Sequence, residues 1–187
     1  MNDIQTMVVN ILGSSEAKKI NSFTFYGKHF TVTTFANIKD LVEQGFIKVE
    51  HDATQTGRAE YDYGTNTLYF GFTSTTELSK KALVVHEAVH AVYDLVKMKM
   101  SVADSESIAY IVQCQYARAN NPNPDERLTS PNKAKDKVFE IGWRIAGKLL
   151  GQDTSQLTDE DYRSMREAVS QHPLYAAKAA GDAGFNG

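Results

Sequence analysis

The sequence predicts a single α+β domain, and three observations support this fold class. Short segments rich in aromatic and β-branched residues fill the first 75 residues, helical periodicity dominates after them, and no linker, repeat or low-complexity tract divides the chain. The 187 residues are enough to bury one sizeable core. We therefore expect residues 1–187 to form one domain, in which the strands of residues 23–72 make one sheet over the first long helix.

Two hairpins and one short strand account for the strand signal. Phe23–Phe35 has aromatic and β-branched residues around a Tyr-Gly-Lys turn, and Ala59–Phe72 has a similar pattern around Gly-Thr-Asn. Between them, residues 37–45 predict a short helix ended by Gly45, and residues 46–50 predict a strand.

Helices are predicted for most of the remaining chain. Ser74 and Glu77 match the capping-box pattern S/T-x-x-E, so the first long helix is expected to begin there and to run to about Lys99. Three further helices are predicted in the rest of the chain, at residues 102–119, 133–150 and 159–170. Residues 181–187 form a tail of mostly small residues.

Composition excludes several classes of protein. The net charge of −3 and the lack of a long basic run argue against nucleic acid as a partner. The N-terminus lacks the basic region of a secretory signal, and no apolar stretch is long enough for a membrane span. The single cysteine, Cys114, excludes an intrachain disulfide and reads as a buried thiol. We expect a cytoplasmic protein, or one exported without a cleavable signal peptide.

The segment Ala82–Val96 predicts a buried helix that nevertheless carries polar side chains. Apart from His86, Glu87, His90 and Asp94 it consists of Ala, Leu, Val and one Tyr. Burying such groups without partners costs a few kcal/mol each. His86 and His90 have the spacing of the H-E-x-x-H motif, which places two imidazoles one helical turn apart on one face, where they can share a Zn²⁺ ion. Glu87 is then placed to hold a water molecule rather than the metal.

A third zinc ligand is expected from the following helix. Glu106 lies 16 residues after His90, in the opening turns of that helix, and is the preferred candidate. Asp104 is the alternative ligand. However, it lies three residues after Ser101, a possible helix cap, where an acidic side chain is favourable without any metal. Asp94 is expected to orient a ligand or to pair with a neighbouring lysine.

These motifs resemble the zincin superfamily of metallopeptidases. HEAVH (His86–His90) followed by ESIAY (Glu106–Tyr110) is similar to the gluzincin pattern of two histidines and a later glutamate, of which the thermolysin-type enzymes are members. Within this superfamily, the sequence most resembles the compact zincin-like domains of bacterial and phage toxins or effectors. The resemblance implies a zincin-like fold, with Asn66–Gly71 as an edge strand beside the active-site helix.

The resemblance also implies a function. It predicts a zinc-dependent hydrolase, foremost a metallopeptidase acting on a protein or peptide, with Glu87 as general base. Tyr110 and His172 are candidates to stabilise the oxyanion, as a tyrosine or histidine does in many zincins; a core aromatic and a surface histidine are the alternatives. Two other functions remain open: a non-catalytic protein-binding module, and an amidase acting on a non-protein amide such as a cell-wall link.

Overall fold

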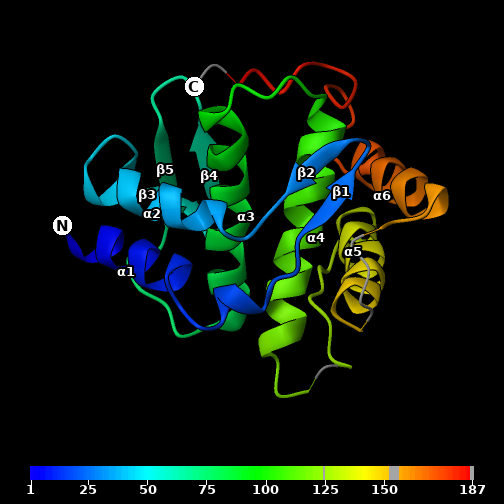
Figure 1. Ribbon diagram of the computed structural model, residues 1–187, viewed down its shortest axis with the longest axis horizontal. Helices are drawn as coiled ribbons and strands as arrows, with labels where there is room; N and C mark the ends of the chain where they lie inside the picture. Colours follow the sequence, from blue (N-terminus) through cyan, green and yellow to red (C-terminus); the bar gives the residue numbers. More distant parts are fainter. Residues whose placement is uncertain (124, 152–155, 186–187) are drawn as a thin grey trace.

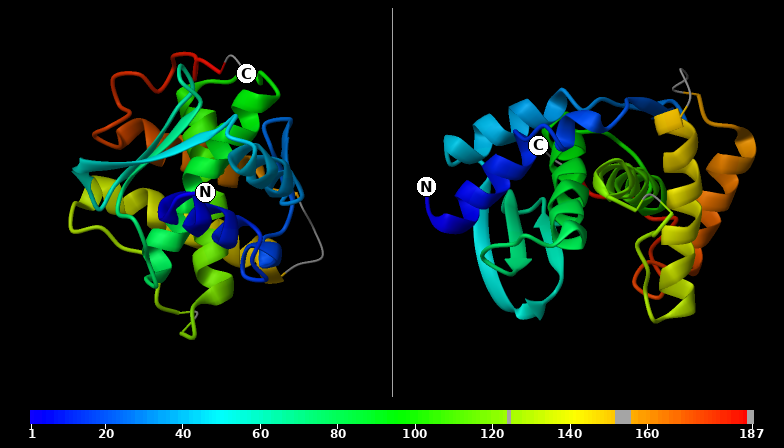
Figure 2. Two further views of the ribbon diagram at one scale, coloured as in Figure 1. Left: turned by 90° about the vertical axis from the view of Figure 1, so that its left-hand side faces the viewer. Right: turned by 90° about the horizontal axis from the view of Figure 1, so that it is seen from below.

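Helix α3 (Leu78–Leu95) lies between a three-stranded sheet and helix α4 (Val102–Asn120), and this arrangement positions the site. The computed structural model describes residues 1–123, 125–151 and 156–185; the last two residues of the small-residue tail lie outside these ranges. Figure 2 shows α5 (Lys133–Gly151) and α6 (Asp159–Gln171) beyond α4, on the side away from the sheet. The α+β class is confirmed. No helix in the described ranges has both the length and the apolar character needed to cross a membrane.

The remaining elements belong to the N-terminal half and can be followed in Figure 1. They are α1 (Asp3–Leu12), a 3₁₀ turn at Ala17–Lys19, β1 (Phe23–Phe25), β2 (Lys28–Phe30), α2 (Thr34–Glu43), β3 (Lys48–Thr56), β4 (Ala59–Asp62) and β5 (Thr67–Gly71).

The prediction of one sheet from residues 23–72 is wrong, because the first hairpin forms a separate two-stranded sheet. β1 and β2 pair antiparallel through a tight turn in which Tyr26 and Gly27 both have positive φ. Pairing ends at Phe30 because α2 begins four residues later. The hairpin instead packs near α6, where the Tyr162 hydroxyl donates to the Thr24 carbonyl at 3.1 Å.

The second sheet has the order β3-β5-β4, so the predicted edge role of Asn66–Gly71 is also wrong. β5 pairs with β3 on one side and with β4 on the other, and β4 is the edge strand that approaches α3. Only Gly57 and Arg58 join β3 to β4, so the chain crosses directly over the end of β5. A Cβ atom on Gly71 would lie 2.0 Å from the Gln55 carbonyl oxygen, which explains the glycine.

Helix α3 is buried as predicted, including every residue from Val84 to Asp94, but its ends differ from the expectation. The capping box is wrong: Ser74 lies in irregular chain outside the helix, and the helix follows Glu77, whose side chain makes no cap hydrogen bond. The helix stops at Leu95, short of Lys99, because Lys97 adopts a left-handed conformation with φ of 50°. The three later helices match the predictions to within one residue at each end.

The C-terminal segment, residues 172–185, folds back across the start of α4. The first backbone N–H groups of a helix have no partner within it. Here Val102 donates to the Gly181 carbonyl and Ala103 to the Ala179 carbonyl, each at 2.9 Å. The segment is therefore fixed to the helix that carries Glu106.

Candidate metal centre

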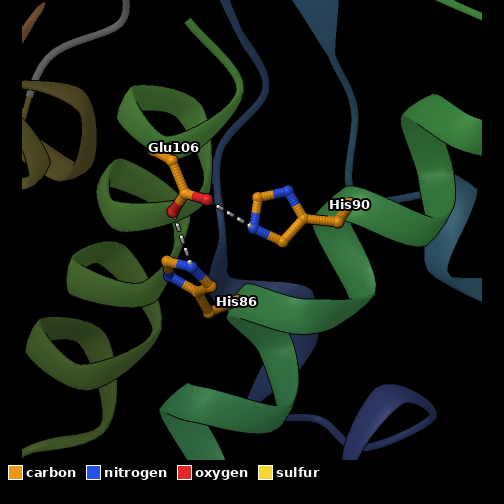
Figure 3. A group of neighbouring side chains, drawn as sticks. All are labelled: His86, His90 and Glu106. Atoms are coloured by element: carbon orange, nitrogen blue, oxygen red, sulfur yellow. Dashed lines mark ion pairs between the residues drawn. The ribbon is translucent and has the colours of Figure 1, made fainter. Parts of the chain in front are cut away.

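Three side chains from two helices converge on one point (Figure 3). His86 and His90 project from α3, and Glu106 projects from α4. One ligand atom from each lies within 4.8 Å of the others. The Nε2 atom of His86 is 3.4 Å from Oε2 of Glu106, and the Nε2 atom of His90 is 3.7 Å from Oε1.

Local sequence explains this convergence. The i, i+4 spacing puts both imidazoles on the face of α3 that meets α4. Ser101 caps α4, because its hydroxyl accepts from the Asp104 N–H at 3.1 Å. With the helix start fixed there, Glu106 falls in the second turn and faces the histidines.

A hydrogen bond to Nδ1, the nitrogen that points away from Glu106, orients each imidazole. Nδ1 of His86 lies 3.0 Å from Oε1 of Gln113, and Nδ1 of His90 lies 2.9 Å from the Ser105 hydroxyl. An amide oxygen only accepts, so His86 donates from Nδ1, and in the neutral ring Nε2, on the side of Glu106, is the nitrogen that can bind a metal. This second layer is the arrangement usual for metal-ligating histidines.

The geometry and chemistry of the cluster fit a divalent transition-metal ion. Two ligands bonded to a tetrahedral zinc ion lie roughly 3.4 Å apart, close to both measured separations. Oε2 of Glu106 is buried and accepts no hydrogen bond from the described residues. Two imidazoles and one carboxylate suit zinc and its first-row neighbours, so the donor set indicates a metal site without distinguishing among these ions.

In the ion-free cluster the electrostatics favour the metal-binding forms of His90 and Glu106, whereas they favour the protonated form of His86. Burial lowers the pKa of His90 to about 4 although the Glu106 charge opposes this, so its imidazole is neutral. Burial raises the pKa of Glu106, but His90 and His86 outweigh that effect and bring it to about 2. For His86, burial lowers the pKa, yet Glu106 and Glu87 reverse the shift and raise it overall.

Glu87 lies beside the cluster but is held by the sheet. Its Oε2 accepts from the backbone N–H of Tyr61 on β4 at 3.0 Å, and the side chain is only 5% exposed. Burial raises its pKa to about 7, an effect that His86 partly offsets. A carboxylate with such a pKa is suited to accept and return a proton near neutral pH.

A cleft of about 360 Å³ opens onto Glu87 and all three members of the cluster. Its walls come from the β3–β4 connection, β4, α4 and the C-terminal segment. The lining residues are Gln55, Arg58, Ala59, Glu60, Tyr61, Tyr63, His86, Glu87, His90, Val102, Ser105, Glu106, Leu174, Tyr175, Lys178, Ala183 and Phe185.

Comparisons of the chain with protein-family models, curated proteins and solved structures find no match.

The other predicted site residues lie outside the cleft. Asp104, the alternative ligand, forms ion pairs with Lys28 and Arg166 at 3.1 Å each. Tyr110 packs its ring edge against His86, with ring centroids 4.7 Å apart, but does not line the cleft. His172 is 2% exposed rather than on the surface, and its Nδ1 accepts from the Leu174 N–H.

The sequence reasoning missed Tyr175, which does line the cleft. Its ring stacks on His172 with centroids 4.7 Å apart, and its hydroxyl interacts with Glu106 and with the Tyr110 hydroxyl. Burial raises the pKa of Tyr175 well above its ordinary value, so the phenol stays protonated and can donate. No periodic pattern marks this residue, because it lies in an irregular segment that reaches the site by folding back.

Proposed function

We propose that the protein is a metal-dependent hydrolase, foremost a zinc metallopeptidase that cleaves a peptide amide bond in the cleft between α3, α4 and β4. One observation carries the proposal. The ligand atoms of His86, His90 and Glu106 lie within 4.8 Å of one another in an open cleft that Glu87 also lines. A purely structural metal site would need neither the cleft nor the additional carboxylate.

A bound zinc ion would supply a Lewis acid that polarises the carbonyl and lowers the pKa of water. The chain's own contribution to the reaction is proton transfer by Glu87. Its carboxylate takes the proton of the attacking water as the new C–O bond forms. It returns that proton to the amide nitrogen as the C–N bond breaks, giving a carboxylic acid and an amine. The Tyr61 N–H holds the carboxylate in place throughout.

The edge of β4 can align an extended substrate. Gly71 donates to the Arg58 carbonyl, so the backbone groups of residues 58, 60 and 62 face β5. The alternate residues face the cleft side: Ala59 presents its N–H and carbonyl, and Tyr61 presents its carbonyl, because the Tyr61 N–H donates to Glu87. Main-chain pairing with such an edge is a common way to hold a peptide. Tyr175 is placed to donate a hydrogen bond to the oxyanion.

The test compares wild type with Glu87→Gln, which retains shape and removes the base. With zinc-loaded proteins and a proteome-derived peptide mixture analysed by mass spectrometry, we expect the variant to retain its zinc and lose activity by about 10²-fold or more. Glu77→Gln, just before the same helix and outside the cleft, is the matched control and should retain activity. Equal cleavage by wild type and Glu87→Gln would sink the hydrolase proposal. Peptide binding without cleavage by either would favour the binding module.

A further inference from the structure

Two cations line the cleft without a carboxylate partner. Arg58 comes from the connection between β3 and β4, and Lys178 comes from the C-terminal segment. Both side chains are exposed, and within the described ranges neither forms an ion pair. Among the other basic residues of the described helical half, seven form ion pairs and six do not. The paired residues are Lys80, Arg127, Lys137, Arg144, Lys148, Arg163 and Arg166.

The backbone at both positions is fixed by hydrogen bonds, and the Lys178 ammonium lies over the Tyr175 ring, 5.9 Å from its centroid. The Arg58 N–H donates to the Gln55 carbonyl at 2.7 Å, and the Arg58 carbonyl accepts from Gly71 at 3.0 Å. The Lys178 N–H donates to the Tyr175 carbonyl at 2.8 Å, and its carbonyl accepts from Gly181 at 2.9 Å. Each cation is therefore carried at a defined place on the cleft wall, at the end of a long side chain that can reach a ligand.

With a divalent metal ion bound, the positive charges of the cleft would outnumber its negative charges. The lining carboxylates are Glu60, Glu87 and Glu106. A divalent ion offsets two of the three negative charges, and the two cations then exceed the remaining one. Glu60 already accepts from the Gln55 amide at 3.2 Å, so it lies on the same wall as Arg58 without pairing with it. A cleft with such an excess attracts ligands of negative charge.

We propose that the cleft selects peptides with acidic side chains close to the scissile bond, and that Arg58 and Lys178 bind those carboxylates. This inference rests on the proposed peptidase function and adds its substrate class. Arginine can bind a carboxylate through two parallel hydrogen bonds, whereas lysine offers one mobile point charge. The two positions should therefore differ in how strongly they discriminate Glu from Gln.

The experiment uses quenched-fluorescent peptide libraries in which Glu or Gln is fixed at successive positions. The zinc-loaded full chain is compared with Arg58→Gln, Lys178→Gln, the double variant and Lys178→Glu. Lys48→Glu makes the same change of charge at an exposed lysine of β3 outside the cleft and serves as the control. Binding of the same peptides to Glu87→Gln protein, by fluorescence anisotropy, gives a readout that does not need catalysis.

We expect wild type to prefer Glu over Gln at one or more positions. In the double variant, the ratio of kcat/KM for Glu peptides to kcat/KM for Gln peptides should fall by about tenfold. Lys178→Glu should reverse the preference at the peptide position that Lys178 contacts. The preference should weaken as salt is raised, because the pairs are solvent-accessible.

The two proposals fail in distinguishable ways. Glu87-dependent cleavage with no Glu preference, or with a preference that Arg58 and Lys178 substitutions leave unchanged, would overturn the inference and leave the hydrolase standing. A Glu preference in binding without any cleavage would support the inference and overturn the hydrolase. If neither cleavage nor binding discriminates Glu from Gln, the inference is overturned.

Discussion

Gln113 holds a candidate ligand in place without touching the metal position itself. It is 5% exposed, and its amide oxygen fixes the ring of His86. Gln113→Leu removes that acceptor while keeping a similar volume. We expect zinc affinity to fall by about 10- to 100-fold, the usual effect of losing such a partner, as measured by competition with a chromophoric chelator.

Gln115 provides the control on the same helix. It is fully buried and bonds to the backbone of Asn21, away from the cluster. Gln115→Leu should therefore lower the free energy of unfolding and leave zinc affinity unchanged. If both variants lost zinc equally, the effect of Gln113 would be general destabilisation.

Tyr175 tests the assignment of the oxyanion donor. Tyr175→Phe removes only the hydroxyl, so we expect kcat to fall by roughly 10²-fold, in the range seen when one such donor is lost, with KM little changed. Tyr110→Phe should have a smaller effect, because Tyr110 lies behind His86 and outside the cleft. The reverse order of effects in steady-state kinetics would restore Tyr110 to the role predicted from the sequence.

At the scale of residues, the sequence allowed prediction of groups whose spacing is set by one helix. His86, Glu87 and His90 needed only the i, i+4 rule, and Glu106 needed only the start of the next helix. Tyr175, Arg58 and Lys178 could not be found in this way, since irregular chain brings them to the cleft.

Asp161 ties the start of α6 to α5. It is 1% exposed and accepts from Thr158, the cap of α6, and from Arg144 and Lys148 of α5. Burial raises the pKa of Asp161, but the Lys148, Thr158 and Arg144 hydrogen bonds outweigh it and bring the pKa to about 2. The folded-state pKa is thus below the ordinary value of about 3.9, so the carboxylate stabilises the fold above that pH.

The resulting pH dependence gives a prediction. Asp161→Asn should cost on the order of 2 kcal/mol of unfolding free energy at pH 6, and the difference from wild type should shrink as pH falls from about 4 towards 2. Urea denaturation across this range measures it. Asp159→Asn, an exposed acid in the same first turn, should change stability little at any pH. A pH-independent cost for Asp161→Asn would argue against the ionic contribution.

Among the elements, helices were predicted better than sheets for a physical reason. Ser101 and Thr158 cap α4 and α6 with local hydrogen bonds that the sequence displays directly. Strand pairing is non-local. The aromatic and β-branched residues of 67–71 indicate a strand. They do not reveal that this strand pairs with β3 as well as with β4. Ser74 shows the converse error, a capping pattern in a segment that forms no helix.

For the whole molecule, metal binding should be coupled to stability, since the cluster joins α3 to α4. At a free zinc concentration 1,000 times Kd, the expected gain is about 4 kcal/mol. For a chain of this length that corresponds to a rise in Tm of roughly 8–16 °C, measured by calorimetry before and after chelation. His86→Ala should abolish the shift. Equal Tm values with zinc and with chelator in the wild type would contradict the metal site.

The backbone hydrogen bonds between the C-terminal segment and α4 have a practical consequence for these measurements. Phe185 lines the cleft with its ring centroid 6.4 Å from that of His90, so a group attached a few residues after Phe185 would be tethered close to the site. A polyhistidine affinity tag attached there would carry spare imidazoles to the mouth of the site, where they can occupy an open coordination position or compete for zinc. The first residues of α1 do not line the cleft, and Met1 is 68% exposed. Tags and immobilisation linkers therefore belong at the N-terminus, with cleavage before any metal titration.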